Sequence, residues 1–243
     1  MLSKKINLFL DTNVVIGYIF CLDSAYVHSK NIFDLNNNFY YSYHVKKEID
    51  NVYERKDDEY SKFFMLLQSK LRRFKNTDFV SLSDFHVFLD KSRPINKMNI
   101  KDMHYALDFM WKLFDFGENQ EVSEIKVRLR DFNVLFDKRH SNKQVEFNNM
   151  AYYVSAHKQK DFEVLNLIKN NLLYQKLHGE DENILFDLHE FNKNNSISNM
   201  ILVSWDRDFI EVVEKLIIKL SFDKYICLND MENNQWKKII NNT

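Results

Sequence analysis

The sequence predicts an α/β fold in which strands from both ends of the chain form one parallel sheet. Residues 6–10 and 200–203 are short apolar runs, the kind that forms fully buried strands. Between them, residues 53–176 show mainly helical spacing of apolar side chains. A sheet closed by strands from both termini explains this order better than two separate domains. We therefore expect a single domain over residues 1–243, with residues 53–176 as a mainly helical insertion.

The N-terminal elements follow from the same spacing. The first strand ends directly at Asp11, and the apolar residues 14–20 predict a helix that begins soon after Asn13. Residues 39–42 predict a second short strand or an extended lead-in. A further helix then begins with Ser42 as its N-cap, because helical spacing continues through Val45, Glu48, Ile49 and Val52.

Three apolar stripes predict the helices of the middle region, and the last third alternates between helix and strand. The stripes contain Phe64, Leu107 and Leu165, and the polar stretch around Pro94 and the acidic turn at Gly117 interrupt them. After the middle region we expect helices over residues 181–191, 209–220 and 233–242, and strands over residues 200–203 and 225–228.

Composition limits the class of protein. Of 243 residues, 45% are hydrophobic, which excludes a disordered chain, and the 3 glycines are too scattered for a phosphate-binding loop. The two cysteines have no metal-ligand spacing, so we expect buried thiols in a reducing cytoplasm. We expect no membrane span, because no apolar run reaches about 18 residues. The net charge of −1 means that any nucleic acid must meet locally concentrated cations.

Four acidic residues occupy positions where ligands are commonly bound. Asp11 and Asp206 follow the two apolar strands, and the carboxyl ends of neighbouring parallel strands share one edge of a sheet. Glu48 lies on a helix with a core-facing side, and Asp181 opens another. Taken singly, each could be a helix cap or a solvated carboxylate. Together they would repel one another unless a cation bound them, and an all-carboxylate set suits Mg²⁺ or Mn²⁺.

Four segments resemble the PIN-domain nuclease family in their order and local pattern. Residues 8–14 (LFLDTNV) look like its opening strand and Asp-Thr-Asn turn, and residues 201–209 (ILVSWDRDF) look like its closing strand and turn. Residues 42–49 (SYHVKKEI) and 181–185 (DENIL) are similar to its second and third acidic motifs. Residues 53–176 match nothing in the family, whose compact members lack so long a helical region.

The resemblance implies a PIN-like parallel sheet sandwiched by helices and divalent-metal-dependent hydrolysis of phosphodiester bonds, usually in RNA. It implies that Asp11, Glu48, Asp181 and Asp206 are the metal-binding and catalytic acids, with Mg²⁺ or Mn²⁺ as cofactor. Polar neighbours would orient these carboxylates. They are Thr12, Asn13, Ser204 and Asp208. Ser204 stands where the family more often has Thr, and Asp208 is the alternative to Asp206 as the fourth acid.

Small bacterial members of the family are often toxins held by an antitoxin. An antitoxin protein is therefore a candidate partner beside the RNA substrate, and assembly with a second copy of the chain is left open. The products would carry 5′-phosphate and 3′-hydroxyl ends.

One stretch is a candidate RNA-binding surface. Between Ser61 and Thr77 there is no acidic residue, and cations alternate with aromatic residues. A helix there could bury the aromatic rings and offer its cations to phosphates, through Lys70, Arg72, Arg73 and Lys75. The alternative is a solvated amphipathic helix whose cations lie near its C-terminal end, as the helix dipole favours. Residues 138–143 are a second, weaker basic stretch.

Two other functions are compatible with parts of the pattern. The chain could be a non-catalytic RNA-binding or scaffold protein that keeps the fold, although all four acids are present. A phosphatase of the haloacid-dehalogenase type would use Asp11 as nucleophile, but that chemistry needs a second Asp where Asn13 stands.

Overall fold

The computed structural model describes residues 5–155, 162–172, 179–197, 199–207, 209–210, 213, 220 and 224–230. The chain divides into two compact units. The first comprises Met1–Tyr18, Ala25–Asp50 and Val145–Thr243, and the second comprises Ile19–Ser24 and Asn51–Gln144. The second unit thus takes up most of the expected insertion, residues 53–176. That the whole chain acts as one domain stays a prediction.

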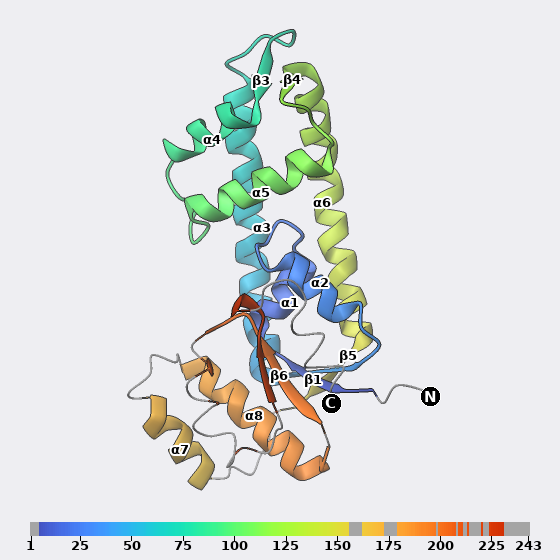
Figure 1. The fold of residues 1–243 in the computed structure, drawn as a ribbon, viewed down its shortest axis with the longest axis vertical. Helices are drawn as coiled ribbons and strands as arrows, with labels where there is room; N and C mark the ends of the chain where they lie inside the picture. The colour runs from blue at the N-terminus through green and yellow to red at the C-terminus, as the bar shows by residue number, and fades with distance from the viewer. Residues whose placement is uncertain are drawn as a thin grey trace. The chain divides into compact units, whose positions relative to one another are not determined.

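The first unit is built on a five-stranded parallel sheet (Figure 1). Its strands are β1 (Asn7–Leu10), β2 (Asn38–Ser42), β5 (Ala151–Val154), β6 (Met200–Ser204) and β7 (Lys224–Cys227). The order across the sheet is β5-β2-β1-β6-β7, and all four neighbouring pairs are parallel. Strands from the two ends of the chain, β1 and β6, therefore lie side by side in the centre, as the sequence predicts.

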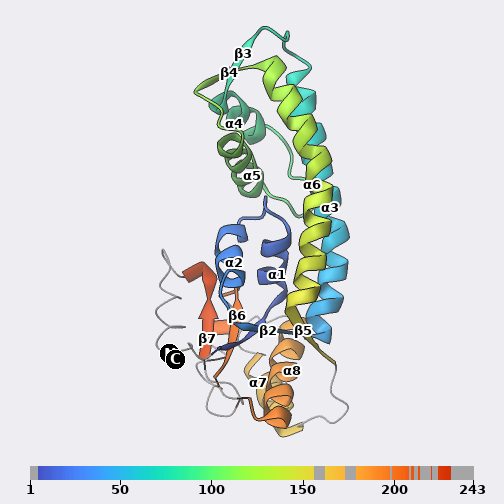
Figure 2. The same ribbon diagram turned by 90° about the vertical axis from the view of Figure 1, so that its right-hand side faces the viewer.

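Helices flank both faces of this sheet, which confirms the predicted fold class (Figures 1 and 2). The helices of the first unit are α1 (Thr12–Ile19), α2 (Tyr26–Phe33), the start of α3 (Tyr43–Leu71), the end of α6 (Val122–Met150), α7 (Phe162–Leu172) and α8 (Gly179–Asn195). A 3-10 turn, η1 (Leu228–Asp230), follows β7. This is the arrangement that the resemblance to PIN domains implies.

The side chains of each strand alternate between the two faces of the sheet, and helices cover both faces. On one face, Phe9 and Tyr40 pack against Phe191 of α8, with ring centroids 6.5 and 5.2 Å apart. On the other face, Phe39 packs against Phe33 of α2, at 5.0 Å. Successive residues of a strand point to opposite faces, so a strand with two buried faces reads as a continuous apolar run.

The second unit is mainly helical. It contains the longer part of α3, α4 (Leu82–Asp90), α5 (Ile100–Leu113) and most of α6. Capping boxes begin α4 at Ser81 and α5 at Asn99. Within this unit α3 and α6 lie side by side in both views (Figures 1 and 2), joined by ring contacts of Phe64 with Phe132 and Phe136.

Three short strands lie within the region whose spacing is mainly helical. β3 (Phe79–Ser81) and β4 (Asn119–Glu121) form an antiparallel pair in the second unit. β5 lies at the edge of the main sheet, beside β2. Strands of three or four residues are too short to show a period of two, so the sequence alone did not reveal them. The expected helices over residues 209–220 and 233–242 fall mostly outside the described residues.

Two features of the composition have structural counterparts. Both cysteines, Cys21 and Cys227, are free and buried, as expected. In the part of the chain that the structure describes, no helix is long and apolar enough to cross a membrane.

Gly17 allows α1 and α2 to approach closely. A Cβ atom at this position would lie 2.8 Å from the Cβ of Ala25 and 2.6 Å from the hydroxyl oxygen of Ser29. We expect Gly17→Ala to destabilise the protein by about 1–2 kcal/mol, because overpacking costs more than the roughly 1 kcal/mol gained in helix propensity. Urea unfolding measures this change. Gly117→Ala is the control, since a Cβ there meets nothing within 4 Å, and equal stability of both variants would contradict the prediction.

Candidate active site

Asp11 lies buried at the carboxyl end of β1, in the centre of the sheet. Its backbone N–H donates to the carbonyl of Val203 at 3.0 Å, which extends the pairing of β1 with β6 by one residue. Its carboxylate accepts two hydrogen bonds, from the backbone N–H of Thr12 at 2.6 Å and from the hydroxyl of Ser204 at 2.6 Å. The Asp side chain is therefore held in one orientation from both strands.

The electrostatic environment of Asp11 is unfavourable for a bare carboxylate. Burial raises the pKa of Asp11 from 3.8 to about 7, and the hydrogen bond from Ser204 opposes this. The negative charges of Asp181 and Glu48 raise the pKa further. Two of the other acids singled out in the sequence, on α3 and α8, therefore act electrostatically on Asp11, which directly follows β1.

Glu48 is oriented by the residue next to Asp11. The hydroxyl of Thr12 donates to a carboxylate oxygen of Glu48 at 2.5 Å. Glu48 lies in the first turns of α3, whose start is capped by the hydroxyl of Ser42, which accepts from the N–H of Val45 at 3.3 Å. The cap predicted at Ser42 is confirmed, and it sets the point from which Glu48 projects.

Ser204 is the centre of a small hydrogen-bond network at this edge of the sheet. Its hydroxyl donates to Asp11 and accepts from the backbone N–H of Asp206 at 2.8 Å and from the side-chain amide of Asn13 at 3.4 Å. The side-chain oxygen of Asn13 in turn accepts from the N–H of Trp205 at 2.8 Å. One serine hydroxyl thus links Asp11 to the backbone that carries Asp206, on the neighbouring strand.

Tyr225 is a residue of this site that the sequence did not indicate. Its hydroxyl donates to the backbone carbonyl of Asp206. Burial raises the pKa of Tyr225 most, Cys227 raises it next, and the negative charge of Asp11 adds a smaller increase. Tyr225 lies on β7, opposite Leu202 of β6. Only the strand order places it here, and a tyrosine in a short apolar strand carries no functional signal.

The remaining predicted site residues fall into two groups. Asp208 lies outside the described residues. The four candidate RNA-binding cations belong to the second unit, at the end of α3 and just beyond it. There Lys70 lies 5.0 Å from the ring centroid of Phe74, Arg73 lies 5.9 Å from that of Phe88, and Arg72 and Lys75 are exposed. These cation–π contacts also suit the purely structural alternative, so an RNA contact stays a prediction.

The donor set suits a hard divalent cation. Asp11, Glu48 and Asp181 offer carboxylate oxygens, which Mg²⁺ and Mn²⁺ prefer. A cation among them would also offset the repulsion that burial intensifies at Asp11. The hydroxyls of Thr12 and Ser204 already orient two of these carboxylates, as ligating groups require. The residues present therefore fit the metal that the resemblance implies.

Comparison with known proteins adds a weak likeness. No family model and no curated protein matches the chain. Among solved structures it is similar to one described as the crystal structure of VapBC2 from Rickettsia felis bound to a DNA fragment from their promoter. The TM-score is 0.38 at 11% identity, and the match covers 91% of this chain and 100% of that chain. So distant a likeness shows neither a family nor an activity, and the function has to be inferred from the site.

Proposed function

We propose that the protein is a divalent-metal-dependent endoribonuclease, with Asp11, Glu48, Asp181 and Asp206 as its metal-binding and catalytic acids. The observation that carries this proposal is that the negative charges of Asp181 and Glu48 act on Asp11, which directly follows the central strand β1. Ligands bind at such edges in open α/β sheets. The motifs around these acids supply the choice of RNA as substrate, through their resemblance to PIN-domain nucleases.

A bound Mg²⁺ or Mn²⁺ ion would polarise the phosphodiester and activate water for attack. The protein's own groups hold the acids in place for this. Ser204 and the N–H of Thr12 fix both oxygens of Asp11, and the hydroxyl of Thr12 fixes Glu48. Such prior orientation spares the reorganisation that a flexible site would need during the reaction.

The raised pKa of Asp11 couples the cation to a proton. With a pKa of about 7, Asp11 is only partly ionised at neutral pH in the absence of a cation. Binding a divalent ion requires the ionised form and therefore releases this proton. We expect the affinity for Mg²⁺ or Mn²⁺ to fall as the pH drops below 7.

If the protein belongs to the toxin group of such nucleases, its physiological partner is an antitoxin protein. That partner would have to suppress cleavage by covering the acids or by displacing the cation. We propose that the protein itself works in the cytoplasm, where both RNA and reduced thiols are found.

Cleavage of labelled single-stranded RNA tests the proposed function. We expect the full-length protein to cut a mixed panel of RNAs in Mn²⁺ or Mg²⁺, to leave 5′-phosphate and 3′-hydroxyl ends, and to be inactive in excess EDTA. Cleavage that persists in EDTA contradicts the metal mechanism. Binding without cleavage over the whole panel, with Mn²⁺ present, would instead support the non-catalytic RNA-binding alternative.

A further inference from the structure

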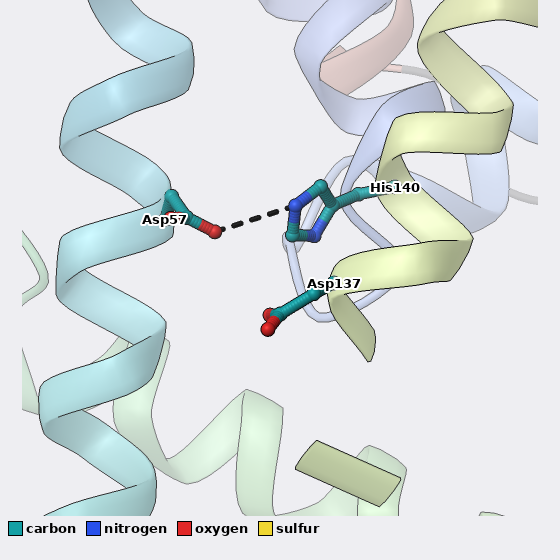
Figure 3. A group of neighbouring side chains, drawn as sticks. All are labelled: Asp57, Asp137 and His140. Carbon is teal, nitrogen blue, oxygen red and sulfur yellow. Dashed lines mark ion pairs between the residues drawn. The ribbon is translucent and has the colours of Figure 1, made fainter. Parts of the chain in front are cut away.

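The second unit contains a group of possible metal ligands that the proposed nuclease does not use. Asp57 lies on α3, and Asp137 and His140 lie on α6 (Figure 3). One ligand atom from each of the three side chains lies within 4.8 Å of the others. Asp137 and His140 are three residues apart on one helix and therefore share a face, which α3 supplements with Asp57.

His140 is buried, with only 4% of its surface exposed, yet it is not fully hydrogen-bonded. Its ring lies among the rings of Phe20, Tyr53 and Phe136, with centroids 5.1–5.3 Å away. Its Nε2 atom faces Asp57 at 3.3 Å, whereas its Nδ1 atom is buried and has no hydrogen-bond partner among the residues that the structure describes. In Figure 3 that second nitrogen lies on the side of the ring nearer Asp137.

A buried nitrogen without a partner needs an explanation, because leaving it so costs about 1–3 kcal/mol. If the histidine simply bridged the two aspartates, Nδ1 would hydrogen-bond to Asp137, and it does not. Burial lowers the pKa of His140 below its ordinary 6.5, although Asp57 and Asp137 oppose this.

We propose that Asp57, Asp137 and His140 bind a divalent transition-metal ion, with Zn²⁺ as the preferred ion. Two carboxylates and one imidazole are a mixed oxygen and nitrogen set that suits such ions, and helical bundles commonly build metal sites from facing helices. Three protein ligands leave one position for water in the four-coordinate geometry of Zn²⁺.

The spacing of the ligand atoms is compatible with one ion. In tetrahedral geometry, ligands about 2.0–2.2 Å from Zn²⁺ lie about 3.3–3.6 Å apart. The observed spacing of up to 4.8 Å therefore has to close by about 1.5 Å, which requires rotation of the aspartate side chains. Asp57 is free to rotate, because 46% of its side chain is exposed, and Asp137 is exposed as well.

This site does not rest on the proposed nuclease activity. Its residues belong to the second unit, and it includes a nitrogen ligand, His140, beside its two carboxylates. A metal ion here would join α3 to α6 and would stabilise the helical unit by binding only its folded form.

Calorimetric titration of the full-length protein with Zn²⁺ tests the proposal, in buffer with millimolar Mg²⁺ to occupy the acidic site. The double variant Asp57→Asn/Asp137→Asn removes two ligands, one from a half-exposed and one from an exposed position, so the fold should survive. Asp131→Asn is the matched control, because Asp131 is an exposed aspartate of the same helix. Thermal unfolding with and without Zn²⁺ gives a second readout.

We expect one Zn²⁺ site in the wild type and in Asp131→Asn. In the double variant the affinity for Zn²⁺ should be at least about 100-fold lower. The rise in melting temperature that Zn²⁺ causes should be lost in the same variant. Asp11→Asn should keep this site, which separates it from the nuclease proposal. Unchanged Zn²⁺ affinity in the double variant, or loss of the Zn²⁺ site in Asp11→Asn alone, would overturn the inference.

Discussion

Asp11→Asn is expected to reduce metal-dependent RNA cleavage by about 10³-fold or more, because a lost carboxylate ligand removes several kcal/mol of charge stabilisation. The substitution keeps the shape of the side chain. Its amide oxygen can still accept one of the two hydrogen bonds that the carboxylate accepts, the one from the N–H of Thr12. The fold should therefore survive, and the loss should be specific to metal binding and cleavage. Asp206→Asn is expected to behave in the same way.

Initial cleavage rates and calorimetric titration with Mn²⁺ measure the two effects together. Asp34→Asn is a suitable control, since Asp34 is an exposed aspartate of the same unit that pairs with Lys30 at 2.6 Å. The control should cleave at the wild-type rate. If both Asp11→Asn and Asp206→Asn kept activity within about twofold of wild type, the assignment of these acids would be wrong.

The second large effect is on the pH dependence of stability in the absence of divalent ions. The pKa of Asp11 is raised from 3.8 to about 7 in the folded protein, so the folded state keeps a proton that the unfolded chain releases. Stability must therefore fall as the pH rises from about 4 to about 7, and it changes no further above that value. A difference of about three pH units, at about 1.4 kcal/mol each, gives a loss of about 4 kcal/mol from this group.

Asp11→Asn cannot ionise, so this loss should be absent from the variant. We expect the variant to be more stable than the wild type by up to about 4 kcal/mol at pH 7.5 in EDTA, and the difference to shrink towards pH 4. Urea unfolding followed by circular dichroism at four pH values measures it, with Asp34→Asn as the control. Adding Mn²⁺ should stabilise the wild type but not the variant. A difference that stays constant with pH would contradict the raised pKa.

The two effects have one physical origin. The same burial and the same neighbouring charges that make the Asp11 carboxylate costly without a cation make it a strong ligand for one. Stability and activity should therefore change in opposite directions when Asp11 is replaced. A residue that only supports the fold would lose both together, so the pair of measurements separates a metal ligand from a structural carboxylate.

The α/β fold class could be predicted from the sequence because buried parallel strands leave a strong local signal. Residues 6–10 and 200–203 are apolar throughout, since side chains on both faces of the sheet are covered, and β1 and β6 lie there. The start of α3 could also be predicted from the local sequence, because the hydroxyl of Ser42 caps this helix. The four acids could be singled out by their positions beside such elements, and their roles as ligands stay predictions.

What the sequence could not decide depends on pairing between distant segments. The strand order places β7 beside β6, and only this brings Tyr225 to the backbone of Asp206. The linking role of the Ser204 hydroxyl likewise arises from groups on different elements, and so do the burial and the nearby charges of Asp181 and Glu48 that raise the pKa of Asp11. Asp57 and His140 are 83 residues apart, and they meet because α3 and α6 pack together in the second unit. Local propensity specifies elements, whereas distances between side chains on separate elements are set by tertiary packing, and the chemistry of both candidate metal sites depends on those distances.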